Sequence, residues 1–207
     1  MLKLLLAILV VSLIDIIISI DVTCNINGGT GCCSLCTAYP SPCNMTFTSD
    51  VTSIDDSAFW ACYQLTSVII PNTISSLGAN SFAWCGGLTS IILPTSITSI
   101  PYGFLQGTAL STLNIPTSIS SIDAYAFKNC QFTSVTIPGS VTSIGSHSFR
   151  ESSLNSVTIP SGVTSIGYAA FYNCASMTSV TIAYSVTSIC MSHYNLYYCC
   201  YYENHHD

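Results

Sequence analysis

Charged side chains are scarce in this chain of 207 residues, which carries three Lys and Arg against nine Asp and Glu. They make up 6% of the sequence, compared with about 25% in an average soluble protein. A net charge of −6 leaves no basic surface for a phosphate backbone, so we expect no nucleic-acid partner. Most of the acids, bases and anion clamps that hydrolases and phosphotransferases need are also missing. We therefore predict that the chain is not an enzyme and uses no cofactor.

Apolar residues are plentiful, at 49% of the sequence, so the chain has enough material for a buried core. Its length suits one domain or one short array of repeats. Because ions are few, Ser and Thr must supply most of the soluble surface.

The first 20 residues have the layout of a secretory signal peptide. Lys3 precedes an apolar run over residues 4–14, and a polar sequence begins after Ile20. The alternative is an uncleaved membrane anchor over residues 4–20, a stretch near the lower length limit for a span. Asp15 argues against an anchor, because a carboxylate at mid-membrane costs about 2.5–3.5 kcal/mol. We expect cleavage near Ser19 or Ile20, and hence a secreted or cell-surface protein.

A repeat of 22 or 23 residues fills most of the remaining chain. Three series of residues keep this spacing. The first is Phe59, Phe82, Phe104, Phe127, Phe149 and Phe171; the second is Pro71, Pro94, Pro116, Pro138 and Pro160; the third is Ile54, Leu77, Ile100, Ile122, Ile144, Ile166 and Ile189. One residue is missing between Ile100 and Phe104, which indicates a loop deletion.

One unit, residues 132–145, predicts how each coil is built. Val135 and Ile137 alternate with polar residues, as in a half-buried strand, and Pro138 ends that strand. A second short apolar stretch ends at Ile144, after which the chain must turn and bring Phe149 inward. We therefore predict a β-solenoid of six to seven coils over residues 50–189, with a short strand pair and one helical or irregular turn per coil.

The repeat resembles the BspA-type leucine-rich repeat family. The shared pattern, LxxVxIPxxVTxIGxxAFxxCxxL, is visible over residues 65–82 and clearest over residues 154–177. The resemblance covers residues 50–189 and implies a leucine-rich-repeat solenoid on a secreted or surface-attached microbial or protist protein, often linked to adhesion. It brings no catalytic residue. Ala183 in the Pro position and Cys190 in the Gly position depart from the pattern and suggest that the repeat ends there.

The cysteines fall into three groups. Cys62, Cys85, Cys130 and Cys174 each follow the repeat Phe by three residues, with Gly107 and Ser152 in that position elsewhere. We interpret these four as small buried apolar residues, of which Cys62 and Cys85 alone lie on adjacent coils and could form a disulfide. We predict disulfides instead in a cap over residues 21–49 and in a Tyr- and Cys-rich cap or tail over residues 190–207. The candidates are Cys24, Cys32, Cys33, Cys36, Cys43, Cys190, Cys199 and Cys200.

The spacing of the cysteines and histidines offers little support for a metal site. Cys33 and Cys36 have the spacing of half a zinc site, but no second well-spaced pair follows. His147 stands in a position that is Ser, Asn, Tyr or Ala in other coils, so we interpret it as a variable surface residue. His193, His205 and His206 lie in the terminal segment. Asn44 begins an Asn-Met-Thr sequon and is a candidate glycosylation site.

The outward positions of the first strand of each repeat form two columns, which we predict to be the binding surface for a protein or glycan on another cell or matrix. The residues are Ser67, Ser90, Thr112, Ser134, Ser156 and Ser179 in one column, and Ile69, Ile92, Asn114, Thr136, Thr158 and Thr181 in the other. An ice- or crystal-binding surface is the alternative, since Thr recurs at strand spacing, although Ser, Ile and Asn interrupt it.

Overall fold

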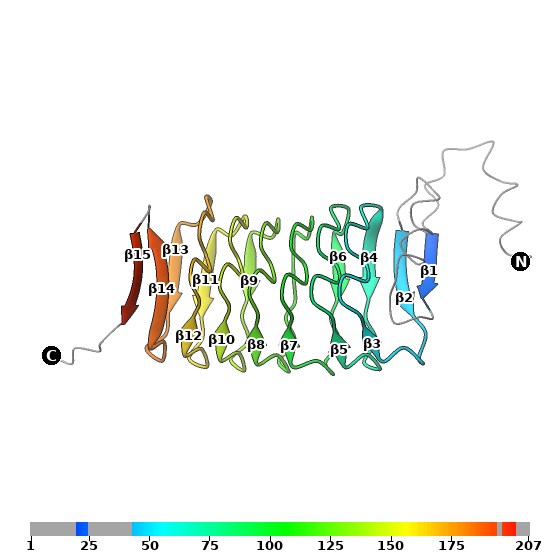
Figure 1. Ribbon diagram of the computed structural model, residues 1–207, viewed down its shortest axis with the longest axis horizontal. Helices are drawn as coiled ribbons and strands as arrows, with labels where there is room; N and C mark the ends of the chain where they lie inside the picture. Colours follow the sequence, from blue (N-terminus) through cyan, green and yellow to red (C-terminus); the bar gives the residue numbers. More distant parts are fainter. Residues whose placement is uncertain (1–19, 25–42, 194–195, 202–207) are drawn as a thin grey trace, which may run out of the picture.

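The chain folds into a stack of parallel coils (Figure 1). The computed structural model describes residues 20–24, 43–193 and 196–201, and it describes side chains over residues 43–189. Outside these residues lie positions 1–19 of the predicted signal peptide and Cys32, Cys33 and Cys36. Among the described residues, none belongs to a helix that is long and apolar enough to cross a membrane.

The described part of the chain forms fifteen strands, most of them very short. They are β1 (Ile20–Cys24), β2 (Cys43–Phe47), β3 (Ser53–Ile54), β4 (Leu65–Ile69), β5 (Ser76–Leu77), β6 (Ser90–Ile92), β7 (Ser99–Ile100), β8 (Ser121–Ile122), β9 (Ser134–Thr136), β10 (Ser143–Ile144), β11 (Ser156–Ile159), β12 (Ser165–Ile166), β13 (Ser179–Ile182), β14 (Ser188–His193) and β15 (Leu196–Tyr201).

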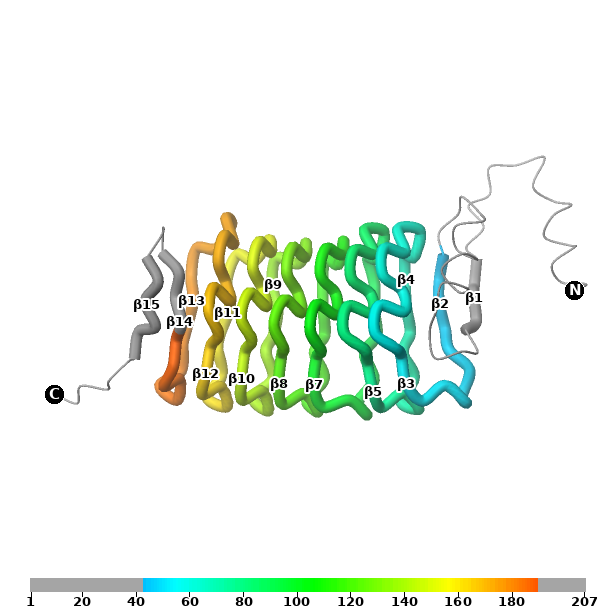
Figure 2. The backbone as a smooth tube through the Cα atoms, viewed as in Figure 1, coloured from blue at the N-terminus to red at the C-terminus, as the bar shows by residue number. Residues whose placement is uncertain are grey.

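Each coil except coil 3 contributes one strand to each of two ladders, as the repeat predicts. We number the coils by the repeat proline position that ends them, which is Ala183 in the last coil: coil 1 is 50–71, coil 2 is 72–94, coil 3 is 95–116, coil 4 is 117–138, coil 5 is 139–160 and coil 6 is 161–183. Equivalent residues pair in parallel, so that Ile144 of β10 lies between Ile122 of β8 and Ile166 of β12. Figure 2 shows the resulting succession of similar turns along the stack. The predicted solenoid is confirmed.

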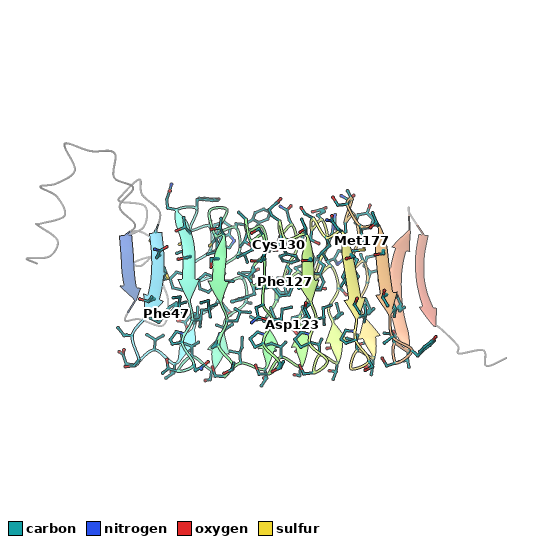
Figure 3. The ribbon with its side chains drawn as sticks, turned by 180° about the vertical axis from the view of Figure 1, so that it is seen from behind. Phe47, Asp123, Phe127, Cys130 and Met177 are labelled. Carbon is teal, nitrogen blue, oxygen red and sulfur yellow. The ribbon has the colours of Figure 1, made fainter. Side chains whose placement is uncertain are left out.

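The interior is filled by files of like side chains. Phe82 is fully buried, and its ring centroid lies 4.9 Å from that of Phe59 and 5.6 Å from that of Phe104. Phe127 and Phe149 continue the file at 5.2 Å. Phe127 lies inside coil 4 (Figure 3). These contacts fix the coils at whole-repeat register.

Coil 3 departs from the predicted alignment by one residue. Between coils 1 and 2, the Phe59 amide donates to the Ser81 carbonyl. Between coils 2 and 3, the Phe82 amide donates to the Phe104 carbonyl. Phe104 is therefore equivalent to Ser81, and Leu105 occupies the position that Phe takes in the other coils. The expectation that Phe104 fills the repeat Phe position is wrong, although Phe104 is still fully buried against Phe82. The expected deletion between Ile100 and Phe104 is wrong as well, because Leu105 follows Ile100 by five residues, the usual number.

The turn that carries the repeat Phe is irregular, and no helix forms among residues 43–189. Alternate residues bond in two directions: the Phe59 amide donates to the Ser81 carbonyl of the next coil (2.8 Å), while the adjacent Trp60 amide donates to the Ser57 carbonyl of its own coil (3.0 Å). Residues in the left-handed backbone conformation accompany this alternation. Within the described ranges, ten non-glycine residues have positive φ: Ser57, Ala61, Asn80, Trp84, Tyr125, Asn129, His147, Glu151, Ala169 and Asn173.

Both ladders are interrupted around coil 3. In later coils the amide of the residue after the repeat Ile donates a hydrogen bond to a carbonyl of the previous coil. The Asp123 amide, for example, donates to the Ile100 carbonyl (2.9 Å). Pro101 stands in this position and has no amide hydrogen, so it cannot donate to Leu77. The β3–β5 sheet accordingly ends at coil 2, and a separate six-stranded sheet begins at β7, which stands farther from β5 than from β8 (Figure 1).

The other ladder has the same interruption. The sheet β1-β2-β4-β6 ends at coil 2, and the sheet β9-β11-β13 begins at coil 4. Between them, coil 3 forms only an isolated bridge between Asn114 and Thr136. Coil 3 thus joins two regular blocks, and we call this junction the seam.

Hydrogen exchange tests the seam. The amide of Asn155 donates to the Thr133 carbonyl (2.9 Å), whereas among the described residues the equivalent Ser111 amide has no acceptor. We expect Ser111 to exchange roughly tenfold faster than Asn155 after correction for intrinsic rates, since one amide hydrogen bond contributes about 0.5–1.5 kcal/mol net. Equal protection of the two amides would show that the ladder is continuous.

Candidate recognition surface

The twelve predicted binding residues lie on one face of the strands, which we call the strand face. Eleven of them are exposed and Ser67 is half-buried. The register aligns Ser67 with Ser90 and Ile69 with Ile92 on β4 and β6. On β9, β11 and β13 it aligns Ser134, Ser156 and Ser179, and likewise Thr136, Thr158 and Thr181. Thr112 and Asn114 lie in coil 3, where only Asn114 is bridged to the next coil.

The seam divides the strand face into two chemically different halves. Over coils 1 and 2, Ile69 and Ile92 are 49% and 56% exposed and lie side by side. Over coils 4 to 6 the same positions are threonines. The face therefore presents an apolar pair at one end and rows of hydroxyl groups at the other.

Asn44 heads the first column, because β2 pairs with β4 and places Asn44 beside Ser67. Its Oδ1 accepts hydrogen bonds from Ser67 Oγ (2.6 Å) and Thr66 Oγ1 (3.3 Å). The sequon thus lies on the strand face, next to coil 1. Glycosylation at Asn44 stays a prediction.

The ladder formed by β3, β5, β7, β8, β10, β12 and β14 is called the second ladder here. Threonines that directly precede its strands donate hydrogen bonds to the neighbouring coil. Thr142 Oγ1 donates to the Ser120 carbonyl (3.0 Å), and Thr164 Oγ1 donates to the Thr142 carbonyl (3.2 Å). Thr187 continues the series on Thr164 (3.2 Å). These side chains bond the neighbouring coil and cover its carbonyl groups without any ion. On the strand face, Thr89 and Thr178 make equivalent bonds to the Thr66 carbonyl (3.2 Å) and the Asn155 carbonyl (3.1 Å). The hydroxyls within β9, β11 and β13, however, have no hydrogen-bond partner within the described part of the chain.

The buried thiols form a polar ladder beside the Phe file. Cys130 Sγ, inside coil 4 in Figure 3, donates to the Leu105 carbonyl (3.2 Å), and Cys174 Sγ donates to the Phe149 carbonyl (3.1 Å). Thr108 and Ser152 occupy the intervening positions and donate to the same two carbonyls. The prediction that Gly107 takes this position was wrong, because coil 3 is shifted by one residue. Burial raises the pKa of Cys85 and of Cys130 to about 12.

Cys62 departs from its predicted role. Like Cys43, it takes part in a disulfide bond, whereas Cys85 has a free thiol. Cys62 is fully buried as predicted, but the interpretation of it as an ordinary small apolar residue is wrong because it is disulfide-bonded, and no Cys62–Cys85 bridge forms. At the other end of the stack, the antiparallel pairing of β14 with β15 places Cys190 opposite Cys199 in the backbone register. Disulfides at Cys24, Cys190, Cys199 and Cys200 stay predictions.

His147 belongs to a stacked file of rings, a feature that treating it as a variable surface position did not reveal. Its imidazole lies 4.8 Å from the Tyr125 ring, nearly parallel to it, and 5.3 Å from Tyr168. Tyr102 extends the file, 5.4 Å from Tyr125. Burial and the nearby Arg150 lower the pKa of His147, so it is neutral at neutral pH. Within the described residues, no group of three or more His, Cys, Asp or Glu side chains is arranged to hold a metal ion.

Comparison with known proteins agrees with the repeat. The family model described as BspA type leucine rich repeat region, with six copies, matches residues 36–132 and 120–204. The crystal structure of the T. pallidum leucine rich repeat protein is similar with a TM-score of 0.59 at 23% identity, over 79% of this chain and 74% of that one. A leucine-rich repeat protein from Bacteroides ovatus also gives 0.59, at 25% identity, over 73% of this chain and 48% of that one. No curated protein sequence matches.

The buried thiols predict a loss of stability at high pH. Above pH about 9 the thiols of the unfolded chain release protons that the folded chain retains, so unfolding becomes easier as the pH rises. Each such thiol lowers the free energy of unfolding by about 1.4 kcal/mol per pH unit between pH 9 and 12. Urea unfolding at pH 9 and pH 10, without reductant, should show a drop about 1 kcal/mol larger in the wild type than in Cys130→Ser, because the unfolded thiol is already about half ionised at pH 9. Identical drops would show that the Cys130 thiol ionises in the folded protein.

Proposed function

Because the chain belongs to the BspA-type leucine-rich repeat family, we propose that it is a non-enzymatic recognition or adhesion protein that binds a protein or glycan through the strand face. The layout of residues 1–20 supports export, and we propose that the protein acts in secreted form or at the cell surface. The binding partner would lie on another cell or on a matrix.

The unpaired hydroxyls within the strands of the strand face carry this proposal. Threonines that directly precede a strand, such as Thr178 before β13 and Thr164 before β12, bond a carbonyl of the neighbouring coil. The strand-face hydroxyls of Ser134, Thr158 and Thr181 have no partner among the described residues. They are free to exchange bonds to water for bonds to a ligand, without giving up any bond that holds the fold.

The apolar pair Ile69 and Ile92 supplies a second kind of contact. Two exposed isoleucines on adjacent coils form an apolar patch on an otherwise hydroxyl-rich face. Patches of this kind, surrounded by polar groups, are typical of recognition surfaces. The strands hold both side chains at fixed positions, so a ligand pays little entropy to order them.

The ice-binding alternative has less support. An ordered-water surface needs a long regular array, whereas the Thr column runs over only Thr136, Thr158 and Thr181 before Asn114 and the isoleucines interrupt it. The seam also breaks the ladder at this point.

A paired substitution tests the strand face. The folded chain, labelled and applied to arrays of extracellular proteins and glycans, should give signals that fall at least tenfold in Ile69→Asp with Ile92→Asp, because two carboxylates would have to be desolvated on binding. The control is Thr52→Asp with Ser75→Asp, which adds the same charge to the same two coils at exposed positions of the other ladder. Equal signals from the two double variants would place the binding surface elsewhere.

A further inference from the structure

The edge of the stack formed by the left-handed turns differs in chemistry from both ladders. We call it the turn edge and define it by residues 78–85, 101–108, 123–130, 145–152 and 167–174 of coils 2 to 6. Lys128 and Arg150, which are the chain's only cations after Lys3, both lie on it. Indole, phenol, imidazole and amide side chains surround them, in place of the Ser and Thr of the ladders.

Backbone hydrogen bonds fix one row of this edge. Trp84 donates to Gln106 (2.6 Å), Gly107 to Lys128 (2.8 Å), and Asn129 to Arg150 (2.8 Å). Since neighbouring coils lie about 4.8 Å apart, the row places the Trp84 backbone about 10 Å from that of Lys128, with Arg150 one coil farther on.

Trp84 offers a flat exposed surface at one end of the row. A Cβ built on Gly107 would lie 2.5 Å from Cε3, 2.9 Å from Cζ3 and 3.0 Å from Cδ2 of the indole, so the ring covers this glycine. Gly107 has φ of +71°, and the lack of a side chain lets the indole lie against its backbone. The side chain of Trp84 is nevertheless 39% exposed.

The two cations stand together farther along the row. Arg150 Nη2 lies 3.0 Å from Glu151 Oε1, and Lys128 Nζ lies 3.8 Å from Glu151 Oε2. The Arg150 guanidinium also lies 5.2 Å from the centroid of the Tyr172 ring. The single carboxylate of Glu151 accepts too few hydrogen bonds to occupy all five N–H donors of Arg150 and all three of Lys128. Both cations therefore keep donors for a further anion.

We propose that the turn edge binds an acidic oligosaccharide, with one sugar ring against the Trp84 indole and a sugar carboxylate at Lys128 and Arg150. The C–H groups of a sugar ring carry partial positive charge and pack on the negative face of an aromatic ring. The carboxylate pairs with the cations, and amides such as Gln106 and Asn129 between them suit sugar hydroxyls. This site shares no residue with the strand face, so the two proposals stand or fall separately.

Calorimetric titration of the folded chain tests the site. The probes are tetragalacturonate and α2,8-linked tetrasialate, each beside its methyl ester, so that the two sources of a sugar carboxylate are distinguished. We expect at least one acid to bind, its ester to bind at least tenfold more weakly, and added NaCl to weaken binding of the acid.

Variants then assign the residues. Lys128→Gln with Arg150→Gln should weaken binding of the acid at least tenfold, while the exchange Lys128→Arg with Arg150→Lys should stay within about threefold of the wild type because both charges remain. Trp84→Ala should weaken binding of acid and ester alike. Trp60→Ala removes a similarly exposed indole from coil 1 and should have no effect.

The proposal is overturned if neither acid binds, if acid and ester bind equally, or if the glutamine double variant binds like the wild type. The glutamine variant changes only partly exposed side chains, and an unchanged melting temperature confirms that it is folded. The ladder variants at Ile69 and Ile92 should bind the sugar normally.

Discussion

Hydrogen bonding from one coil to the next is the constraint on which this structure depends. In each turn, alternate amides such as that of Phe149 donate to the following coil, and the short strands of both ladders do the same. A single coil would leave these groups without partners and its apolar side chains half covered, so coils are stable only in a stack. The repeat length is fixed for the same reason: an extra or missing residue must be absorbed locally. Coil 3 absorbs one after its turn, since Pro116 follows Leu105 by 11 residues whereas Pro94 follows Phe82 by 12.

The scarcity of charge follows from the same architecture. Each coil exposes carbonyl groups beside its neighbour, and short hydroxyl side chains such as Thr142 and Thr164 reach them without the entropy cost of ordering a long charged side chain. Threonines that directly precede the strands of both ladders use their hydroxyls in this way, whereas the hydroxyls within β9, β11 and β13 stay available on the strand face. Side-chain diversity is concentrated on the turn edge, where left-handed residues carry the side chains outward. The two surfaces proposed for binding differ accordingly: one is uniform and neutral, the other is varied and locally cationic.

The sequence predicted the solenoid, the Phe file and the strand face, because periods of two within a strand and of 22 or 23 between coils follow from geometry alone. It did not predict the exact alignment of coil 3, since Phe104 and Leu105 are adjacent, both apolar and both fully buried. The left-handed turns were also missed, because most of the residues concerned are not Asn, Asp or His, the types enriched at positive φ. The turn edge escaped notice for a related reason: its positions vary from coil to coil, and only the coordinates show that Trp84 covers Gly107 and that the two cations meet at Glu151.

Comparing the deletion of one whole coil with the deletion of half a coil tests the stacking account most directly. Deletion of residues 139–160 takes out coil 5 and joins Pro138 to Ser161, which restores the repeat. The shortened protein should keep the far-ultraviolet circular dichroism per residue of the parent and unfold cooperatively at a somewhat lower temperature. Deletion of residues 139–149, half of that coil, should abolish cooperative unfolding, because it takes every later coil out of register. If both deletions were tolerated equally, or if the whole-coil deletion failed to fold, the account would be contradicted.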